Sequence, residues 1–383
     1  MRGSRNIDSR LRGNDKEFMN DKNITIATIG SHSALEVARG AKDEGFNNII
    51  VCEKGREKTY ATYYKTDGDT GCVDEVILVD KFSDILKPEI QQQLIEKNAI
   101  FIPNRSFEVY INNYDAIEND FKVKMYGNKK LLRIEERGFH PNQYDLLDEA
   151  KIRYPKQFKN PDEINSLCIV KVLEKERGFE RAFFFASSEA NYKQEAERLI
   201  AEGKITQEAL DKAVIEEFIV GVQVNFNFFY SPLSNRLELL GTDTRRQTNL
   251  DGILRLPSSL QTKILEDHKV EIKYEEASHT AVTVLESLLE QVFAMGERFV
   301  EASKKFANPG VIGPFALQAM IVAGPPKKDI VVFDVSRRFP GSPGITATPY
   351  SGYLFGKSIN VGRRIAMEIK EALRDNRLEE IIT

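Results

Sequence analysis

The chain has 383 residues, 41% hydrophobic and 29% charged, and its 54 basic and 58 acidic side chains give a formal net charge of -4. This balance excludes a broad basic surface for nucleic acid. No run approaches the roughly 20 apolar residues that a bilayer span requires. We therefore expect no nucleic-acid partner, no membrane association and a cytoplasmic location, and the length predicts two or three domains.

The chain offers few soft metal ligands. Its three cysteines, Cys52, Cys72 and Cys168, are odd in number and far apart, which argues against a disulfide framework and a paired-cysteine metal site. None of its four histidines lies at helical ligand spacing from another, which disfavours a zinc hydrolase. Any metal should therefore have oxygen ligands.

The first third of the chain predicts a disordered tail and a small α/β domain. Residues 1–21 lack apolar periodicity, and Met19 is a second candidate start for translation. The β-branched run 24–29, a helix through Glu44 capped by Ser31 or Ser33, and a strand over 48–52 form a parallel strand–helix–strand unit. With further strands at 75–79 and 99–103, residues 22–125 are expected to form a doubly wound domain.

The rest of the chain predicts a mixed α+β arrangement in two parts, residues 126–220 and 221–383. Helices are expected over 129–137, 144–151, 188–201, 207–213, 282–306 and 359–373. Strands are expected over 168–173, 181–186, 214–220, 222–230, 237–240, 316–322 and 330–335. The longest helix, 282–306, is predicted from the helical spacing of its apolar residues, the first of which is Leu285.

Anion-binding residues follow two strands of the predicted first domain. Gly30-Ser31-His32-Ser33 lies between a strand and a helix, where free backbone N–H groups favour an anion. Lys54 and Arg56 follow the next strand and should lie at the same edge of the sheet. Together they predict a phosphate or carboxylate pocket, although His32 alone would be typical of a surface position.

A lysine and a charged loop mark the middle of the chain. Lys171 interrupts an apolar strand and needs an anionic partner unless it extends from an edge strand to solvent. The loop 174–181, which contains Arg177 and Arg181, joins two apolar strands and would otherwise be a solvated hairpin tip. The segment 215–221 could present backbone groups to an adenine and a carboxylate to a ribose.

Near the end of the chain, the alternation of a strand places Asp334, Ser336 and Arg338 on one face. A carboxylate, a hydroxyl and a guanidinium on one face suit Mg²⁺ and a phosphoryl group. Gln318 on the adjacent strand could complete the shell with its amide oxygen. The alternative is a charged outer face of an antiparallel sheet.

These pieces, in this order, resemble the ATP-grasp ligases. Within them the chain resembles the archaeal formate-dependent synthetases of 5-formaminoimidazole-4-carboxamide ribonucleotide. The likeness extends from Ile24 to the C-terminus, and its most specific segments are 26–33, 54–56, 126–128, 241–245, 249–252, 312–315 and 349–351. It implies an α/β and α+β protein with an N-terminal Rossmann-like domain, an ATP-grasp lid over 126–220 and a C-terminal ATP-grasp subdomain.

The resemblance also implies an activity and a set of site residues. Formate would be phosphorylated by ATP to formyl phosphate, which the 5-amino group of the ribonucleotide would attack, in a cytoplasmic and homo-oligomeric enzyme of purine biosynthesis. Mg²⁺ or Mn²⁺ would be held by Gln318 and Asp334, and Lys171 and Arg338 would be catalytic. ATP would contact Lys171, Arg177, Arg181, Glu216, Glu217 and Ile219, and the substrate would contact His32, Lys54, Arg56, Ser106, Arg245 and Asn249.

Three departures from the family pattern cluster around this chemistry and suggest a divergent paralogue. Asn104-Arg105 replaces the family's His-Gly before Ser106, the loop 176–181 is not glycine-rich, and Gly341-Ser342-Pro343-Gly344 replaces the usual Gly-Gly-Thr-Asn. Two alternatives remain: a ligase for another acid or amine, or a non-catalytic nucleotide sensor. A Rossmann dehydrogenase would need Gly-x-Gly-x-x-Gly after the first strand, which is absent.

Overall fold

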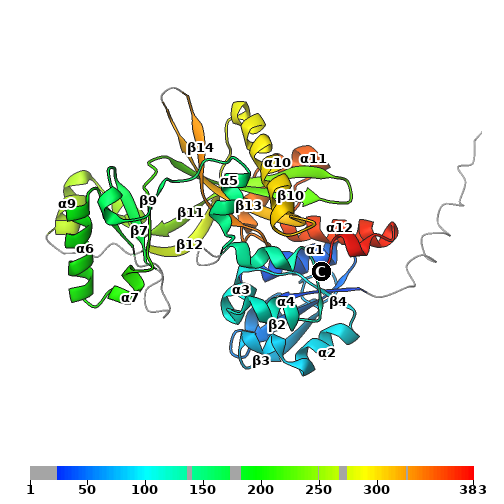
Figure 1. The fold of residues 1–383 in the computed structure, drawn as a ribbon. Helices are drawn as coiled ribbons and strands as arrows, with labels where there is room; N and C mark the ends of the chain where they lie inside the picture. Colours follow the sequence, from blue (N-terminus) through cyan, green and yellow to red (C-terminus); the bar gives the residue numbers. More distant parts are fainter. Residues whose placement is uncertain (1–23, 136–139, 173–182, 249, 267–273, 325–326) are drawn as a thin grey trace, which may run out of the picture.

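The computed structural model describes residues 24–135, 140–172, 183–248, 250–266, 274–324 and 327–383. Within these ranges the strands form three sheets: a parallel one near the N-terminus, a long antiparallel one in the centre and a small antiparallel one that projects from it (Figure 1). None of the helices in these ranges is long and apolar enough to cross a membrane. The predicted tail, residues 1–21, lies outside the described residues.

The parallel sheet has the strand order β3-β2-β1-β4-β5. Its strands are β1 (Thr25–Ile29), β2 (Asn47–Glu53), β3 (Glu75–Val79), β4 (Ala99–Phe101) and β5 (Lys124–Met125). Every residue of β1 is buried, as the β-branched sequence predicts. The sheet is accompanied by α1 (Ala34–Asp43), α2 (Pro88–Glu96), α3 (Arg105–Ile111), α4 (Tyr114–Asn119), the π-helix η3 (Thr59–Tyr63) and the 3-10 helix η4 (Phe82–Leu86).

The central antiparallel sheet has the order β12-β11-β10-β13-β14. Its strands are β10 (Val222–Ser231), β11 (Arg236–Thr248), β12 (Tyr274–Ala281), β13 (Gly313–Val322) and β14 (Asp329–Ser336). One face packs on α10 (Leu289–Phe306) and α5 (Gln143–Glu149) through an aromatic core in which Phe299 stacks on Phe315 and Phe315 on Phe228. The other face carries the buried polar residues Asn225 and Asn227, and further along the strands it carries Phe229 and Leu240, which belong to a second apolar cluster.

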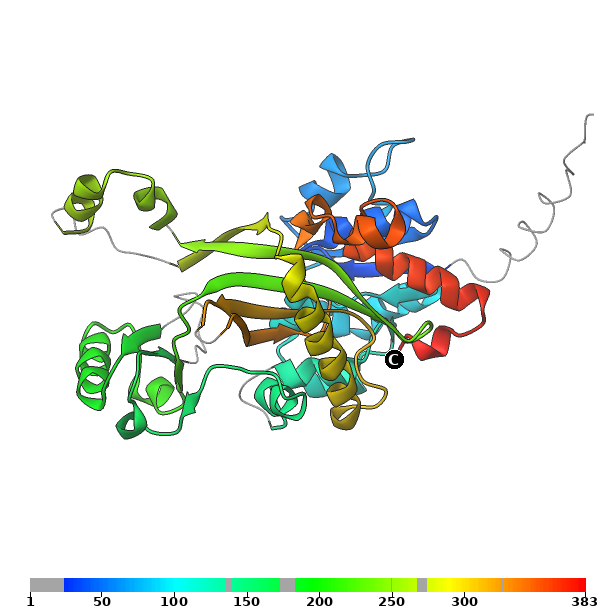
Figure 2. The same ribbon diagram turned by 90° about the horizontal axis from the view of Figure 1, so that it is seen from above.

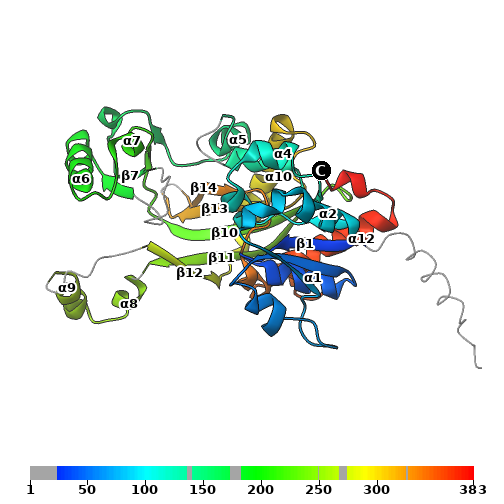
Figure 3. The same ribbon diagram turned by 90° about the horizontal axis from the view of Figure 1, so that it is seen from below.

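The small sheet has the order β6-β9-β7-β8 and forms the lid (Figure 2). Its strands are β6 (Gln157–Phe158), β7 (Cys168–Lys171), β8 (Phe183–Ala186) and β9 (Val214–Glu217), accompanied by α6 (Glu189–Ala201), α7 (Gln207–Leu210) and η6 (Pro161–Glu163). The helices α8 (Leu250–Leu254) and α9 (Ser258–Glu266) project at the same end of the central sheet, on the other flank (Figure 3). The remaining helices are η5 (Lys129–Glu135), η7 (Glu286–Leu288), η8 (Pro343–Ala347), α11 (Tyr350–Phe355), α12 (Val361–Arg374) and η9 (Leu378–Glu380).

Helix α12 joins the C-terminal segment to the first domain by packing on α1. The two helices meet at glycines: a Cβ on Gly40 would lie 2.2 Å from the Arg363 backbone N, and a Cβ on Gly362 would lie 2.3 Å from the Glu36 carbonyl oxygen. The Val361 N–H donates to the buried carboxyl group of Glu36 at 3.0 Å. The parallel sheet is thereby held against the central sheet.

The structure differs from the secondary-structure predictions at three places. The helix predicted to begin at residue 282 begins at Leu289, after the short 3-10 turn η7, and Leu285 is exposed. The edge strand β12 was not predicted, and β11 extends to Thr248 rather than ending at residue 240. Strand β12 is largely polar, so its sequence lacks the apolar alternation on which a strand prediction depends.

Candidate active site

Lys171 lies on the lid strand β7 and has the anionic partner that its position requires. Its ammonium group forms an ion pair with Glu216 on β9, whose side chain is 3% exposed. Tyr144 on α5 donates its hydroxyl hydrogen to the other Glu216 oxygen at 2.9 Å. Glu216 therefore connects the lid to a helix of the central body, and Lys171 presents a positive charge at this junction.

The hinge after β9 contributes further predicted nucleotide contacts. The Glu217 carboxylate accepts from the Lys156 backbone N–H at 3.3 Å, and Ile219 is buried. An apolar and a carboxylate side chain thus lie at the end of β9, and a site for a nucleoside requires both kinds. The predicted lid residues Arg177 and Arg181 lie outside the described residues.

A row of polar side chains crosses four strands on the polar face of the central sheet. Asp243 pairs with Asn225, Asn225 with Gln318 and Gln318 with Asp334 in the register of β11, β10, β13 and β14. Directly paired residues share a face, so the predicted metal ligands Gln318 and Asp334 lie side by side. The Gln318 Nε2 donates to an Asp334 carboxylate oxygen at 3.0 Å.

The donor set of this row fits a hard divalent cation. Asp334 supplies a carboxylate and Gln318 an amide oxygen, and the Asn225 Oδ1 is buried with no hydrogen-bond partner among the described residues. Oxygen ligands of this kind suit Mg²⁺. No group of three histidine, cysteine, aspartate or glutamate residues in the described ranges is placed to hold a metal by itself, and the three cysteines are free and buried.

The turn after β1 brings His32 to the central sheet. His32 and Ser33 have left-handed backbone conformations, with φ of 25° and 68°, which cost energy in residues other than glycine. The Ser106 hydroxyl donates to Ser31 Oγ at 2.9 Å and so supports the turn. The His32 ring lies directly against Gly341, because a Cβ there would lie 1.4 Å from the His32 Cε1.

Lys54 and Arg56 lie at the same edge of the parallel sheet, but their described contacts are local. Lys54 pairs with Asp80 at 2.6 Å, and this hydrogen bond raises the pKa of the lysine. Arg56 donates to the Tyr110 hydroxyl at 3.1 Å and lies 5.3 Å from the centre of the Phe82 ring. These contacts do not join either residue to His32.

Arg338 does not extend the alternation of β14, because the strand ends at Ser336. Its guanidinium donates to Glu135 at 2.8 Å, and Arg105 contacts the same carboxylate oxygen at 3.4 Å. Burial and the nearby Glu135 carboxylate raise the pKa of Glu108, which also contacts Arg105, to about 8. The expected placement of Arg338 beside Asp334 on a strand face is thus wrong, and Arg338 joins a buried ionic cluster at the domain junction.

Arg245 lies on the polar face of the central sheet, beside a residue that the sequence did not single out as functional. It pairs in register with His279 on β12, and His279 contacts the Asp243 carboxylate at 2.6 Å. The two residues are 36 positions apart in the sequence, so no local spacing could reveal the contact. Asn249 lies outside the described residues.

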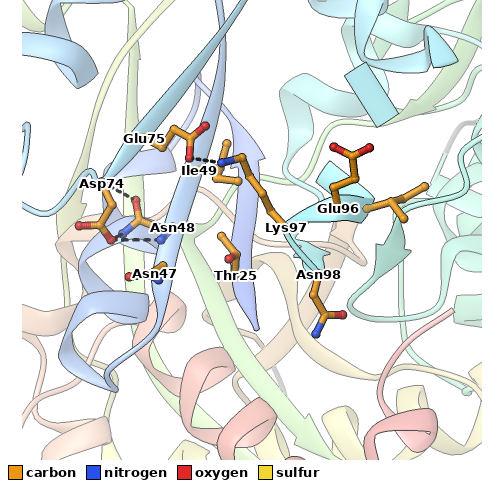
Figure 4. A pocket seen from close by; sticks show the side chains of 10 residues that line it. Thr25, Asn47, Asn48, Ile49, Asp74, Glu75, Glu96, Lys97 and Asn98 are labelled. Carbon is orange, nitrogen blue, oxygen red and sulfur yellow. Dashed lines mark hydrogen bonds and ion pairs between the residues drawn. The ribbon is translucent and has the colours of Figure 1, made fainter. Parts of the chain in front are cut away.

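A separate groove lies at the opposite, amino-terminal edge of the parallel sheet (Figure 4). Its polar groups bind one another: Lys97 forms an ion pair with Glu75 at 2.7 Å, and the Asn48 Nδ2 donates to Asp74 at 2.9 Å. Ligands of open α/β sheets bind at the carboxyl ends of the strands. We therefore assign the site to the region between the lid, the central sheet and the His32 turn.

A small antiparallel sheet that carries Lys171 and a central antiparallel sheet that carries the Gln318–Asp334 pair form the arrangement of an ATP-grasp fold. The fold is shared with the ADP complex of purK, the N5-carboxyaminoimidazole ribonucleotide synthetase, at a TM-score of 0.54 and 12% identity, over 88% of this chain and 77% of that one. The predicted ATP-grasp fold is thereby confirmed, and the ligase class agrees with the relatives, which are named as synthetases.

The chain belongs to the family of 5-formaminoimidazole-4-carboxamide-1-(β)-D-ribofuranosyl 5′-monophosphate synthetases. It is 39% identical to the synthetase of Methanopyrus kandleri over 363 residues, which cover 94% of this chain and 96% of the relative. It is 38% identical to the synthetase of Methanocaldococcus jannaschii over 367 residues, which cover 95% of this chain and 96% of the relative. The crystal structure of an IMP biosynthesis protein PurP from Thermococcus kodakaraensis matches with a TM-score of 0.69 and 28% identity, over 94% of this chain and all of that one. Two family models also match, a protein of unknown function (DUF1246) over residues 26–158 and a domain of unknown function (DUF1297) over residues 191–383.

Proposed function

We propose that the chain is the ATP- and formate-dependent ligase that formylates 5-aminoimidazole-4-carboxamide ribonucleotide. The proposal is supported by three parts of the structure: the Lys171–Glu216 ion pair of the lid, the Gln318–Asp334 pair of the central sheet and the His32 turn against Gly341. The names of the relatives supply the substrate class. Formyl phosphate is the expected intermediate.

ATP lies between the lid and the central sheet in this proposal. Lys171 offsets the negative charge of the phosphates, Glu217 receives the ribose hydroxyl groups and Ile219 contacts the base. Glu216 keeps the lysine at the mouth of the lid, because its buried carboxylate is also held by Tyr144. Arg177 and Arg181 of the segment 174–181 are further cations for the phosphates in this proposal, whereas Arg338 is paired with Glu135 at the domain junction.

Mg²⁺ or Mn²⁺ would be held by Gln318 and Asp334 and would neutralise charge on the transferred phosphoryl group when bound. The chain's own residues arrange the two substrates around that position. His32, Ser106, Arg245 and Asn249 bind the ribonucleotide, and Lys54 and Arg56 attract its phosphate. Closure of the lid sheet over the centre would protect the acyl phosphate from water.

The test is release of ADP by the full-length chain in the presence of ATP, Mg²⁺, formate and the aminoimidazole carboxamide ribonucleotide. Formylated ribonucleotide should appear in a one-to-one ratio with ADP. A folded sample that binds ATP but releases no ADP would contradict the proposal and favour a nucleotide sensor. Release of ADP only with another small acid or amine would favour the alternative ligase, for which the departures at Asn104, Arg105 and 341–344 give a reason.

Homo-oligomeric assembly and a cytoplasmic location belong to the same proposal. Light scattering coupled to size-exclusion chromatography tests the first, and a mass equal to one chain would contradict it.

A further inference from the structure

His279 and Asp243 form a buried pair that the proposed ligand contacts do not use. Asp243 is inaccessible to solvent, and the His279 side chain is 12% exposed. The carboxylate accepts from the His279 ring at 2.6 Å, from Asn227 Nδ2 at 2.7 Å and from Asn225 Nδ2 at 3.0 Å. Burial opposes ionisation of Asp243, but these hydrogen bonds outweigh it and hold its pKa below the ordinary value.

This network fixes which nitrogen of the imidazole faces the carboxylate. An ionised carboxylate only accepts hydrogen bonds, so the His279 nitrogen in contact with it, Nδ1, carries the proton. In the neutral ring Nε2 is then the basic nitrogen. The two asparagines keep Asp243 in place on the sheet, and Asp243 keeps the imidazole in one tautomer and orientation, as the aspartate of a catalytic triad does.

The pair lies on the face of the central sheet that carries the proposed metal ligands. Asp243 belongs to the same row as Gln318 and Asp334, two and three strands away from them. The His279 Nδ1 lies 3.5 Å from the Ser342 hydroxyl, and the preceding residue, Gly341, contacts the His32 ring. His279 therefore adjoins the loop 341–344, which also contacts the proposed ribonucleotide ligand His32.

We propose that His279, oriented by Asp243, accepts the proton that the amine loses in the acyl-transfer step. The inference rests on the proposed function and deepens it. The amino nitrogen forms a bond to the formyl carbon, and the bond between that carbon and the phosphate oxygen breaks with its electron pair leaving on inorganic phosphate. The departing N–H proton passes to His279 Nε2, and later to solvent.

The experiment separates acyl-phosphate formation from amine attack in the full-length chain. Hydroxylamine is small and largely unprotonated near neutral pH, so it traps formyl phosphate as a hydroxamate without an enzymic proton acceptor. With ATP, Mg²⁺, formate and hydroxylamine, His279→Gln should make hydroxamate and ADP within about threefold of the unaltered chain. With the ribonucleotide instead, its kcat should fall about 10²–10³-fold, with KM for the ribonucleotide changed less than about threefold.

Asp243→Asn should likewise preserve hydroxamate formation and lower kcat with the ribonucleotide, because it removes the carboxylate that sets the His279 tautomer while it preserves the shape of the side chain. The matched control is His140→Gln, because His140 forms a similar pair with Asp145 at 3.3 Å on the surface, where its side chain is 82% exposed. This control should leave both rates unchanged. Equal loss of both rates in His279→Gln and Asp243→Asn, or an unchanged kcat with the ribonucleotide, would overturn the inference. An unaltered chain that makes no hydroxamate from formate would instead contradict the proposed function.

Discussion

Glu36 gives a pH dependence of stability whose size follows from the structure. Its carboxyl group is buried between α1 and α12, where it accepts one hydrogen bond from the Val361 N–H at 3.0 Å. Burial raises the pKa of Glu36 from 4.5 to about 7, with the backbone hydrogen bond opposing the change. The folded state therefore binds this proton more tightly than the unfolded state does.

The sign follows from linkage. Because the folded-state pKa is the higher one, the contribution of Glu36 to stability is complete below pH 4.5 and is lost as the pH rises to about 7. At 1.36 kcal/mol for each pKa unit, the full loss is about 3 kcal/mol. Between pH 5 and pH 8 the loss attributable to this group should be about 2–3 kcal/mol of unfolding free energy.

Glu36→Gln removes the ionisation while keeping the shape and the acceptor for Val361. Its second polar atom faces the same surroundings as the Glu36 Oε2, which is buried without a hydrogen-bond partner among the described residues. At pH 5 the variant and the unaltered chain should therefore be similar in stability. At pH 8 the variant should be the more stable by about 2–3 kcal/mol.

Urea unfolding followed by circular dichroism at pH 5, 6, 7 and 8 measures the difference. Glu89→Gln on the exposed face of α2 is the matched control, and its difference from the unaltered chain should not vary with pH. A gap between Glu36→Gln and the unaltered chain that stays constant from pH 5 to pH 8 would refute the reasoning. Other groups, Glu108 among them, cancel because they are present in both proteins.

Three further predictions concern the site. Lys171→Ala should lower ADP release about 10²-fold or more, since it removes a charge from the phosphate position, and an unchanged rate would mean that ATP binds elsewhere. Asp334→Asn should raise the Mg²⁺ concentration needed for half-maximal ADP release by at least about tenfold; an unaltered titration would exclude it as a ligand. Gly341→Ala should raise KM for the ribonucleotide, because its Cβ would displace the His32 ring. The control Gly352→Ala should leave KM unchanged, because no atom lies nearer than 3.8 Å to its Cβ. Equal kinetics in both variants would argue against a role for His32.

The sequence predicted the parts of the fold where burial and periodicity agree. The fully buried β1 and the amphipathic α12 lie where their patterns indicate, within two residues at each end. The segment that precedes Leu289 was misassigned because Leu285 and Leu288 fit the apolar spacing of the helix, although Leu285 is exposed and the helix begins only at Leu289. Tertiary pairing with β11, which no local pattern encodes, makes β12 a strand.

The residues of the candidate site also divide into those that a local sequence pattern predicted and those whose position depends on tertiary contacts. Lys171 was found because a charge inside an apolar strand is a local anomaly, and its partner Glu216 is indeed buried. Gln318 and Asp334 were paired correctly because they lie on adjacent strands of a hairpin. Arg338 was misplaced because the alternation was extended beyond the end of β14, and His279 was missed because its contact with Asp243 depends on the register of two distant strands.

The departure from the family pattern at Asn104 and Arg105 has a structural explanation. The buried Asn104 side chain donates to the Ile29 and Ser31 carbonyl oxygens, each at 3.3 Å, and accepts from the Phe107 N–H at 3.1 Å. It thus holds the strained turn of His32 to the first turn of α3. Arg105 meets Arg338 at the Glu135 carboxylate, and the backbone N–H of Phe339 donates to the Pro103 carbonyl oxygen at 3.2 Å.

These contacts connect the ribonucleotide side of the site to the end of β14, which carries Asp334. Transfer of an acyl group requires the amine and the acyl phosphate to be held within bonding reach, and small displacements are costly. Replacement of His-Gly by Asn-Arg is therefore compatible with the proposed substrate, because Asn104 holds the backbone of the His32 turn and Arg105 contacts the Glu135 carboxylate. On this reasoning Asn104→Ala should lower the rate of acyl transfer to the ribonucleotide more than it lowers the rate of hydroxamate formation from hydroxylamine. A larger loss of hydroxamate formation would show that the asparagine acts on the phosphoryl step.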